Sequence, residues 1–252
     1  MNDLLSVKGK TILLTGAAGY LGSAMGVYLQ EQGAMVVGMS RSEKVRDLYT
    51  KSIVCDLNHE VVAINYINEI LWKYPIDVLI NNAYDLSSKT GFGLTSEKLT
   101  YSHWISAFDS LYWTAWLTEY IGVDMCYRNS GSIINISSMY SKIAPDPKLY
   151  EDTNYWNPES YSVMKAGINM LTKRTAVKYG SSNVRCNAVL PGAFPNDSVK
   201  DKTFLQRLRD KSVLGRTGKP EELFGIIQYL ASDASSFTTG QEFIVDGGWT
   251  CV

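Results

Sequence analysis

A tyrosine and a lysine stand four residues apart, as Tyr161 and Lys165, within a segment of helical pattern. Two residues at this spacing lie on one face of a helix. A free tyrosine titrates at about 10 and exchanges protons poorly at neutral pH, but a neighbouring ammonium stabilises the phenolate and lowers the pKa of the phenol. The pair could carry acid–base chemistry, or it could be an ordinary contact between two surface side chains.

A glycine-rich segment near the N-terminus could hold phosphate groups. Gly16, Gly19 and Gly22 follow the β-rich run Thr11–Thr15 and lead into a helical pattern. Glycines at such a turn let the backbone approach a pyrophosphate closely, and the free N–H groups at the start of the helix supply a positive pole. The alternative is a tight strand-to-helix turn that binds nothing.

The end of the second apolar run indicates which dinucleotide would bind. An acidic side chain at this place would hold the ribose diol of NAD, but the chain has Ser40 and Arg41 there. Arginine can pair bidentately with a 2′-phosphate, so the sequence favours NADP(H) over NAD(H). The alternative role for Arg41 is a solvated loop charge.

The segments that must position these residues alternate between short apolar runs and helical patterns. Strands are predicted at residues 11–15, 35–39, 52–55, 78–80, 132–136, 184–189 and 242–245. Helices are predicted at about 20–32, 60–73, 96–127, 160–179, 199–211 and 220–232. Runs that are apolar throughout are typical of a parallel sheet covered on both faces. We therefore expect one doubly wound α/β domain of the Rossmann type, spanning residues 1–252, with a seven-stranded parallel sheet.

The composition restricts the class of protein. Of 252 residues, 45% are hydrophobic and 19% charged, which allows a full core and excludes disorder. A formal charge of −1 without a polybasic stretch argues against nucleic acid and membrane surfaces as partners. No signal peptide or membrane span is evident, and the four cysteines are dispersed, without metal-ligand spacing. We expect a cytoplasmic protein with a small-molecule substrate and no metal.

In their order along the chain, the motifs resemble those of the single-domain short-chain dehydrogenases/reductases, from about residue 6 to 249. The matching positions are the glycine turn 16–22, Asp56-Leu57, Asn81-Asn82-Ala83, Ile136-Ser137-Ser138, Tyr161 with Lys165, Pro191-Gly192, and the segments 230–233 and 245–248.

The resemblance implies an oxidoreductase that interconverts an alcohol and a carbonyl compound. Ser138 would orient the carbonyl oxygen, Tyr161 would give or remove the proton, and Lys165 would lower the pKa of Tyr161 and hold the nicotinamide ribose. The residues implied to contact the cofactor are Gly16, Gly19, Tyr20, Leu21, Gly22, Ser40, Arg41, Asp56, Leu57, Asn82, Ala83, Tyr84, Tyr161, Lys165, Pro191, Gly192 and Phe194.

Three positions depart from the family pattern. The glycines are spaced three and three apart, a form commoner in the branch that modifies nucleotide sugars. Tyr84 stands where the family usually has a glycine beside the cofactor. Matching the long helix to the family pattern puts Leu111, with Ser110 beside it, where an asparagine usually anchors a water of the proton relay.

The segment 139–160, between Ser138 and Tyr161, is longer than usual in the family. It carries aromatic rings, three prolines and several carboxylates and amides, namely Tyr140, Pro145, Asp146, Pro147, Tyr150, Glu151, Asp152, Asn154, Tyr155, Trp156 and Pro158. Rings beside acceptors suit a polyhydroxylated substrate, although a stiff surface loop is the alternative. Together with the segment 191–196 it resembles reductases of bacterial surface-carbohydrate and flagellin-glycan pathways.

The long helix carries many aromatic rings, namely Tyr101, Trp104, Phe108, Tyr112, Trp113, Trp116 and Tyr120. They face too many directions for one intramolecular stripe, so we expect a homo-oligomer, a dimer or tetramer, with a packed core helix as the alternative. His103 and Cys186 lie outside any motif and are expected to be packing residues.

These patterns predict an NADP(H)-dependent oxidoreductase that interconverts a secondary alcohol and a ketone on a sugar or nucleotide-linked sugar. Two alternatives stay open at this point. The same chemistry could act on a small or lipid-like ketone, or the chain could be a catalytically weak cofactor-binding or scaffolding member of the family.

Overall fold

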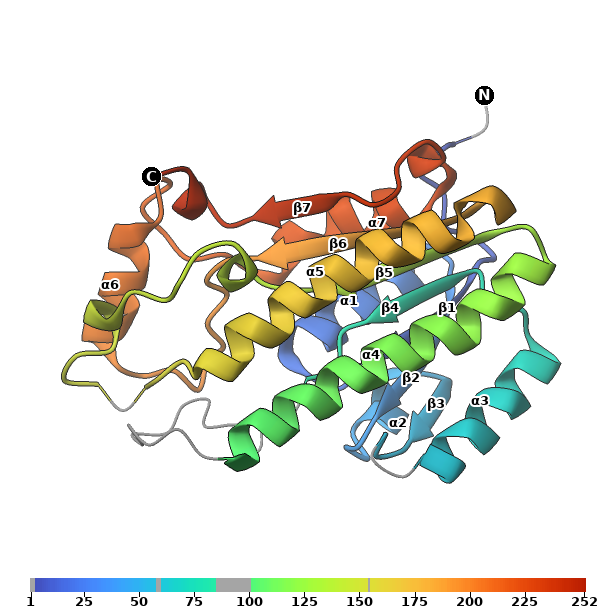
Figure 1. Ribbon diagram of the computed structural model, residues 1–252, viewed down its shortest axis with the longest axis horizontal. Helices are drawn as coiled ribbons and strands as arrows, with labels where there is room; N and C mark the ends of the chain where they lie inside the picture. Colours follow the sequence, from blue (N-terminus) through green and yellow to red (C-terminus); the bar gives the residue numbers. More distant parts are fainter. Residues whose placement is uncertain (1–2, 58–59, 85–100, 154) are drawn as a thin grey trace.

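The computed structural model describes residues 3–57, 60–84, 101–153 and 155–252, and its strands form one sheet (Figure 1). The strands are β1 (Thr11–Thr15), β2 (Met35–Ser40), β3 (Lys51–Val54), β4 (Val78–Asn81), β5 (Gly131–Ile136), β6 (Val184–Pro191) and β7 (Glu242–Val245). They pair in the order β3-β2-β1-β4-β5-β6-β7, and every pair is parallel. The predicted Rossmann-type fold with a seven-stranded parallel sheet is confirmed.

Helices cover both faces of this sheet. They are α1 (Tyr20–Glu31), α2 (Val45–Leu48), α3 (Glu60–Lys73), α4 (Tyr101–Tyr127), α5 (Glu159–Tyr179), α6 (Lys202–Lys211) and α7 (Phe224–Ala231). One core joins the sheet to α3, α4 and α5, and a second core joins it to α1 and α7 (Figure 1). None of the described helices is long and apolar enough to cross a membrane.

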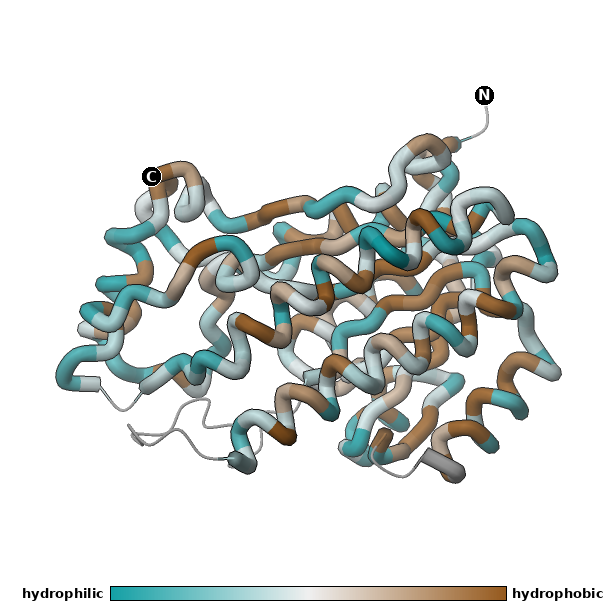
Figure 2. Tube along the Cα trace, viewed as in Figure 1, coloured by the Kyte–Doolittle hydropathy of each residue, from teal (hydrophilic) through white to brown (hydrophobic). Residues whose placement is uncertain are grey.

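The strands are apolar throughout because they are buried from both sides. Along β1, Leu13 packs into the core of α3 to α5, whereas Ile12 and Leu14 pack into the core of α1 and α7. All three side chains are fully buried. Figure 2 shows the same feature as hydrophobic colour along the strands in the middle of the molecule.

The helix predictions differ from the structure at a few ends. The short helix α2 was not predicted, and α6 begins at Lys202 instead of residue 199. The α6 boundary has a local cause, since the Asp201 carboxylate accepts a hydrogen bond of 2.9 Å from the Phe204 backbone N–H and caps the helix. The predicted helix 220–232 is a 3₁₀ turn, Pro220–Leu223, followed by α7. The predicted start of the long helix at residue 96 lies outside the described residues.

The strand order determines where a ligand can enter. The connection after β1 leads to α1 on one face, and the connection after the neighbouring β4 leads to the helices on the other face. Such a switch point opens a crevice at the carboxyl ends of the strands. The segment 139–160 and α6 lie beyond this edge of the sheet (Figure 1).

Candidate active site

A cleft of about 670 Å³ lies at the carboxyl ends of the strands. Every residue predicted to act in catalysis or cofactor binding lies on its wall. These residues are Gly16, Gly19, Tyr20, Leu21, Gly22, Ser40, Arg41, Asp56, Leu57, Asn82, Ala83, Tyr84, Ser138, Tyr161, Lys165, Pro191, Gly192 and Phe194. The fold therefore brings together seven segments that are far apart in the sequence.

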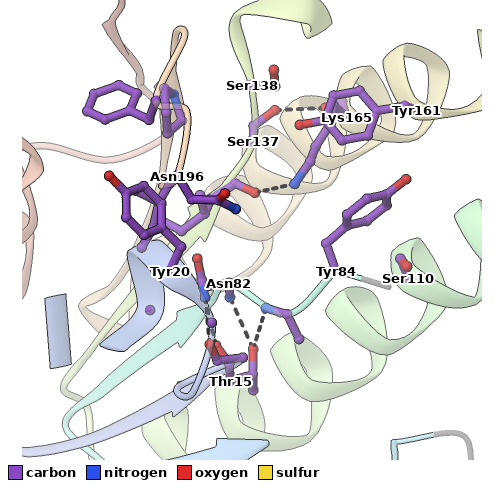
Figure 3. A pocket seen from close by; sticks show the side chains of 18 of the residues that line it. Thr15, Tyr20, Asn82, Tyr84, Ser110, Ser137, Ser138, Tyr161, Lys165 and Asn196 are labelled. Atoms are coloured by element: carbon purple, nitrogen blue, oxygen red, sulfur yellow. Dashed lines mark hydrogen bonds between the residues drawn. The ribbon is translucent and has the colours of Figure 1, made fainter. Parts of the chain in front are cut away.

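The glycine turn has no room for side chains. Gly16 has φ +64°, and a Cβ there would come within 2.9 Å of the Ala83 Cα. A Cβ on Gly22 would come within 2.2 Å of the Gly16 carbonyl oxygen. The Thr15 hydroxyl accepts hydrogen bonds of 3.0 Å from the backbone N–H groups of Asn82 and Ala83, which ties this turn to the end of β4 (Figure 3).

The start of α1 has the features of an anion site. Its first turn contains no acidic residue, and Gly19, at the N-cap, provides no side-chain cap that would occupy the terminal N–H groups. Free N–H groups at a helix start favour a phosphate. The glycine turn therefore fits the pyrophosphate of a dinucleotide.

The far end of the cleft carries the residues that would contact the adenosine. Ser40 and Arg41 follow β2, and Asp56 and Leu57 follow β3. The nearest carboxylate to Arg41 in sequence, Glu43, pairs with Arg46 at 2.6 Å. β2 and the two residues after it contain no acidic side chain that could hold a ribose diol.

The residues predicted to act in catalysis lie on α5 and just after the end of β5. The Lys165 Nζ donates a hydrogen bond of 2.9 Å to the carbonyl oxygen of Ile136, and the Ser137 hydroxyl donates one of 3.0 Å to the carbonyl oxygen of Lys165. Both bonds fix α5 against β5. Tyr161, one turn before Lys165, shares a hydrogen bond with the Ser138 side chain. Hydroxyl, phenol and ammonium groups in this arrangement are suited to moving a proton at a carbonyl oxygen.

Burial governs the titration of this pair. It lowers the pKa of Lys165 to about 8. It also raises the pKa of Tyr161, against the opposing effect of the hydrogen bond from Ser138. Desolvation of the phenolate is the larger of these two effects on Tyr161.

Tyr84 packs directly on Tyr161 and Lys165. Its ring meets the Tyr161 ring edge-on, with centroids 5.2 Å apart, and the Lys165 Nζ lies 5.6 Å from the Tyr84 ring centroid. Figure 3 shows Tyr84 and Ser110 on one side of the cleft, with Tyr20 and Asn196 on the other. A side chain thus occupies the place where the family usually has none.

Leu111, which stands where the family usually has an asparagine, packs into the interface with α5, where a Cβ on Gly167 would come within 2.9 Å of it. The neighbouring Ser110 lines the cleft, and its hydroxyl donates a hydrogen bond of 2.9 Å to the carbonyl oxygen of Ser106. Adjacent residues of a helix lie about 100° apart, so the two side chains have different surroundings.

The segment 139–160 forms the wall opposite the glycine turn. Tyr140, Tyr150, Tyr155 and Trp156 line the cleft, as does Asn157, which no sequence pattern singled out. The carboxylates that the sequence suggested as acceptors do not line it. Asp146 pairs with Lys211 at 2.7 Å, Glu151 and Asp152 are exposed, and Asn154 lies outside the described residues.

Other predicted features lie away from the cleft wall. Cys186 is buried in β6, where burial raises the pKa of its thiol to about 12, and His103 is buried on α4. Both are packing residues. No three His, Cys, Asp or Glu side chains among the described residues lie close enough together to hold a metal.

The fold and the cleft define a Rossmann-type oxidoreductase that uses a dinucleotide. Residues 16–250 match the family described as Enoyl-(Acyl carrier protein) reductase. The chain belongs to the short-chain dehydrogenase/reductase family and is an NAD(P)-dependent oxidoreductase.

Several relatives are named for sugar ketones or sugar acids, whereas others are named for different substrates, such as the 3-oxoacyl-[acyl-carrier-protein] reductase of Thermotoga maritima, which is 30% identical over 97% of this chain and 99% of that protein. The 5-keto-D-gluconate 5-reductase of Escherichia coli is 29% identical, with 98% of each chain covered. The sorbose reductase of Candida albicans is 30% identical over 99% of this chain and 90% of that protein. A gluconate 5-dehydrogenase from Burkholderia cenocepacia, solved with NADP and tartrate, has a TM-score of 0.83 and 26% identity over 99% of this chain and 98% of its own. These relatives give no support to the resemblance to flagellin-glycan reductases.

Proposed function

We propose that this chain is an NADP(H)-dependent reductase of polyhydroxylated ketones, such as a sugar or a sugar acid. One observation carries the proposal: Ser138, Tyr161 and Lys165 share a single cleft with the glycine turn on one side and a wall of tyrosines and amides on the other. The cofactor would supply the hydride.

The chain's own residues would hold the dinucleotide along the cleft. The N–H groups at the start of α1 would bind the pyrophosphate, and Asp56 and Leu57 would contact the adenine. Lys165 would hold the nicotinamide ribose. Lys165 lines the cleft, with its Nζ bonded to the Ile136 carbonyl oxygen and 5.6 Å from the centroid of the Tyr84 ring. The rest of the cleft wall around the dinucleotide would be formed by Tyr20, Pro191, Gly192 and Phe194.

The proton would move at the carbonyl oxygen of the substrate. Ser138 would donate a hydrogen bond to that oxygen and orient it, and Tyr161 would protonate it in reduction or accept the proton in oxidation. The Lys165 ammonium, 5.7 Å from the Tyr161 ring centroid, would stabilise the phenolate that reduction leaves behind.

The preference for NADP(H) rests on Arg41. Its side chain lies on the wall next to Ser40, where the 2′-phosphate of a bound cofactor would lie. We expect the wild-type protein to bind NADPH more tightly than NADH by at least tenfold, the effect of one charge-assisted contact of about 1.4 kcal/mol or more. Equal dissociation constants in calorimetry would contradict this.

The substrate class rests on the relatives and on the tyrosine wall. A turnover screen with NADPH should include 5-keto-D-gluconate, L-sorbose, erythrulose, simple ketones and a 3-oxoacyl thioester. We expect the polyhydroxylated ketones to give the highest kcat/KM. A clear preference for the thioester or for simple ketones would overturn the proposed class and favour a lipid-like or small carbonyl substrate.

We also propose that residues 1–252 act as one domain and assemble as a homo-oligomer. Tyr101, Phe108 and Tyr112 are exposed on α4, and Val177 is exposed on α5 beside it. Apolar side chains in such number on two adjacent helices suit a partner subunit. Sedimentation at micromolar concentration tests this, and a monomer would contradict it.

A further inference from the structure

Three side chains of the segment 139–160 form a connected polar cluster on the substrate side of the cleft. They are Tyr140, Tyr150 and Asn157, here called the tyrosine–amide cluster, and all three line the cleft. The hydroxyls of Tyr140 and Tyr150 are 3.2 Å apart. Tyr140 is joined to the candidate catalytic site through its backbone N–H, which donates a hydrogen bond of 3.1 Å to the Ser138 hydroxyl.

Tyr150 lies at the centre of this cluster. Its hydroxyl is 3.2 Å from that of Tyr140, and either hydroxyl can be the donor. Burial raises the pKa of Tyr150, against the opposing effect of hydrogen bonds with Tyr140 and Asn157, so the phenol keeps its proton. A protonated phenol both donates and accepts hydrogen bonds, so the Tyr150 hydroxyl can donate to a ligand in the cleft.

Asn157 has an acceptor that no group among the described residues satisfies. Its side chain is 8% exposed, and its Oδ1 is buried without a hydrogen-bond partner. A buried acceptor left in this state costs about 1–3 kcal/mol. Asn157 lines the cleft, which places this buried acceptor beside the space that a ligand would occupy.

From this arrangement we infer that Tyr150 and Asn157 form a specificity subsite for a hydroxyl group carried on the carbon chain of the ketone. The Tyr150 hydroxyl donates to that group, and the Asn157 Oδ1 accepts from it. The inference rests on the proposed function and deepens it, because a ketone without the hydroxyl would leave the buried acceptor unsatisfied. Sites built in this way reject analogues that lack the hydroxyl more strongly than apolar pockets reject a missing methylene.

The subsite is held rigidly by α6. The Tyr155 ring stacks on Phe204 with centroids 4.5 Å apart, and Tyr150 packs on the same ring. Arg207 donates hydrogen bonds to the carbonyl oxygens of Leu149 and Glu151. Contacts on both sides of Tyr150 limit its freedom before a ligand arrives, which is what precise recognition of a hydroxyl requires.

The test compares two ketones with the same four-carbon skeleton, erythrulose with its three hydroxyls and 2-butanone with none. The readout is the ratio of their kcat/KM values with NADPH. We expect Asn157→Leu and Tyr150→Phe each to lower this ratio about ten- to a hundredfold. Tyr229→Phe is the matched control, since its hydroxyl bonds to Thr238 away from the cleft and its loss should leave the ratio unchanged.

A ratio that stays the same in both variants, or that changes equally in the control, would overturn the subsite. If the wild type reduces neither ketone, the proposed function is at fault. The subsite is then decided by calorimetric binding of erythrulose to the NADPH-bound protein. Weaker binding by Asn157→Leu than by the wild type supports it, and equal or absent binding overturns it.

Discussion

The two walls of the cleft are built by different means. The pyrophosphate part of the dinucleotide wall is made of backbone, and Gly16 and Gly22 lie so close to Ala83 and to the Gly16 carbonyl that no side chain fits at either position. The substrate wall is made of side chains, in which Tyr150 and Tyr155 pack on Phe204 of a helix some fifty residues later. A backbone wall binds what all dinucleotides share, whereas a side-chain wall can be changed residue by residue and so decides the substrate.

The largest effect is expected where the two walls meet. Tyr161→Phe removes the proton donor and keeps the ring that packs on Tyr84. General acid–base catalysis contributes about 10²–10⁴-fold, so kcat should fall by that factor while NADPH affinity stays close to that of the wild type. Steady-state kinetics and calorimetry measure the two quantities. Near-normal kcat would mean that another group donates the proton.

The buried ammonium of Lys165 should make stability depend on pH. Its pKa is about 8 in the cofactor-free fold and about 10.4 in an unfolded chain, so the unfolded state binds more protons between these values. The free energy of unfolding should therefore rise with pH across this window, by up to about 3 kcal/mol from Lys165 alone.

The buried Cys186 thiol has the opposite sign, since its raised pKa of about 12 lowers stability above the pKa of an unfolded thiol. The decisive quantity is therefore the difference between the wild type and Lys165→Met in denaturant unfolding from pH 7 to 10. If this difference in the free energy of unfolding did not change with pH, the lowered pKa of the buried Lys165 would be contradicted.

The backbone wall should not tolerate a single methyl group. In Gly22→Ala the new Cβ would lie 2.2 Å from the Gly16 carbonyl oxygen, so the turn must shift. Overpacking of this kind costs about 1–3 kcal/mol, and we expect both lower stability and loss of NADPH binding. Gly225→Ala is the matched control, since nothing lies within 4 Å of the new methyl group on α7. If Gly22→Ala bound NADPH normally, the turn would not be the pyrophosphate site.

Arg41 tests the part of the cofactor site that would distinguish NADPH from NADH. Arg41→Ala should weaken NADPH binding by roughly ten- to a hundredfold and leave NADH affinity nearly unchanged, because NADH carries no 2′-phosphate for this guanidinium to hold. Arg46→Ala is the control on the neighbouring helix α2, where the guanidinium pairs with Glu43. A similar loss for both cofactors would assign Arg41 to the shared part of the dinucleotide.

The smallest effect is expected on the substrate wall. Trp156 lines the cleft and its ring lies 5.9 Å from the buried His103 ring, so Trp156→Ala should remove a stacking surface and little else. We expect KM for a sugar-type ketone to rise several-fold while NADPH affinity is unchanged. Trp72→Ala, on the exposed face of α3, is the control. An unchanged KM would leave Trp156 outside the substrate site.

The difference between the walls also explains what the sequence could predict. Local signals were sufficient for the strands, because runs such as Thr11–Thr15 are apolar throughout and buried on both faces. The glycine turn and the Tyr161–Lys165 pair follow from local spacing in the same way. Their common cleft then follows from the parallel sheet, whose strand ends meet at one edge.

The substrate wall depends on contacts between distant segments, which spacing along the chain does not contain. The sequence gives no sign that Asp146 would turn away to pair with Lys211, or that Asn157 would line the cleft instead. The sequence likewise could not show how Ser110 and Leu111 are oriented on α4. In the structure Leu111 packs on Gly167, and Ser110 lines the cleft.

One measurement tests the central claim most directly, namely the fate of a labelled hydride. The protein is incubated with a polyhydroxylated ketone and NADPH that carries deuterium at the transferring carbon of the nicotinamide, and the product is analysed by mass spectrometry. The account predicts that the deuterium appears on the alcohol carbon of the product, and that Tyr161→Phe slows its appearance by at least about a hundredfold. Consumption of the ketone without deuterium in the alcohol, or equal transfer by Tyr161→Phe, would contradict it.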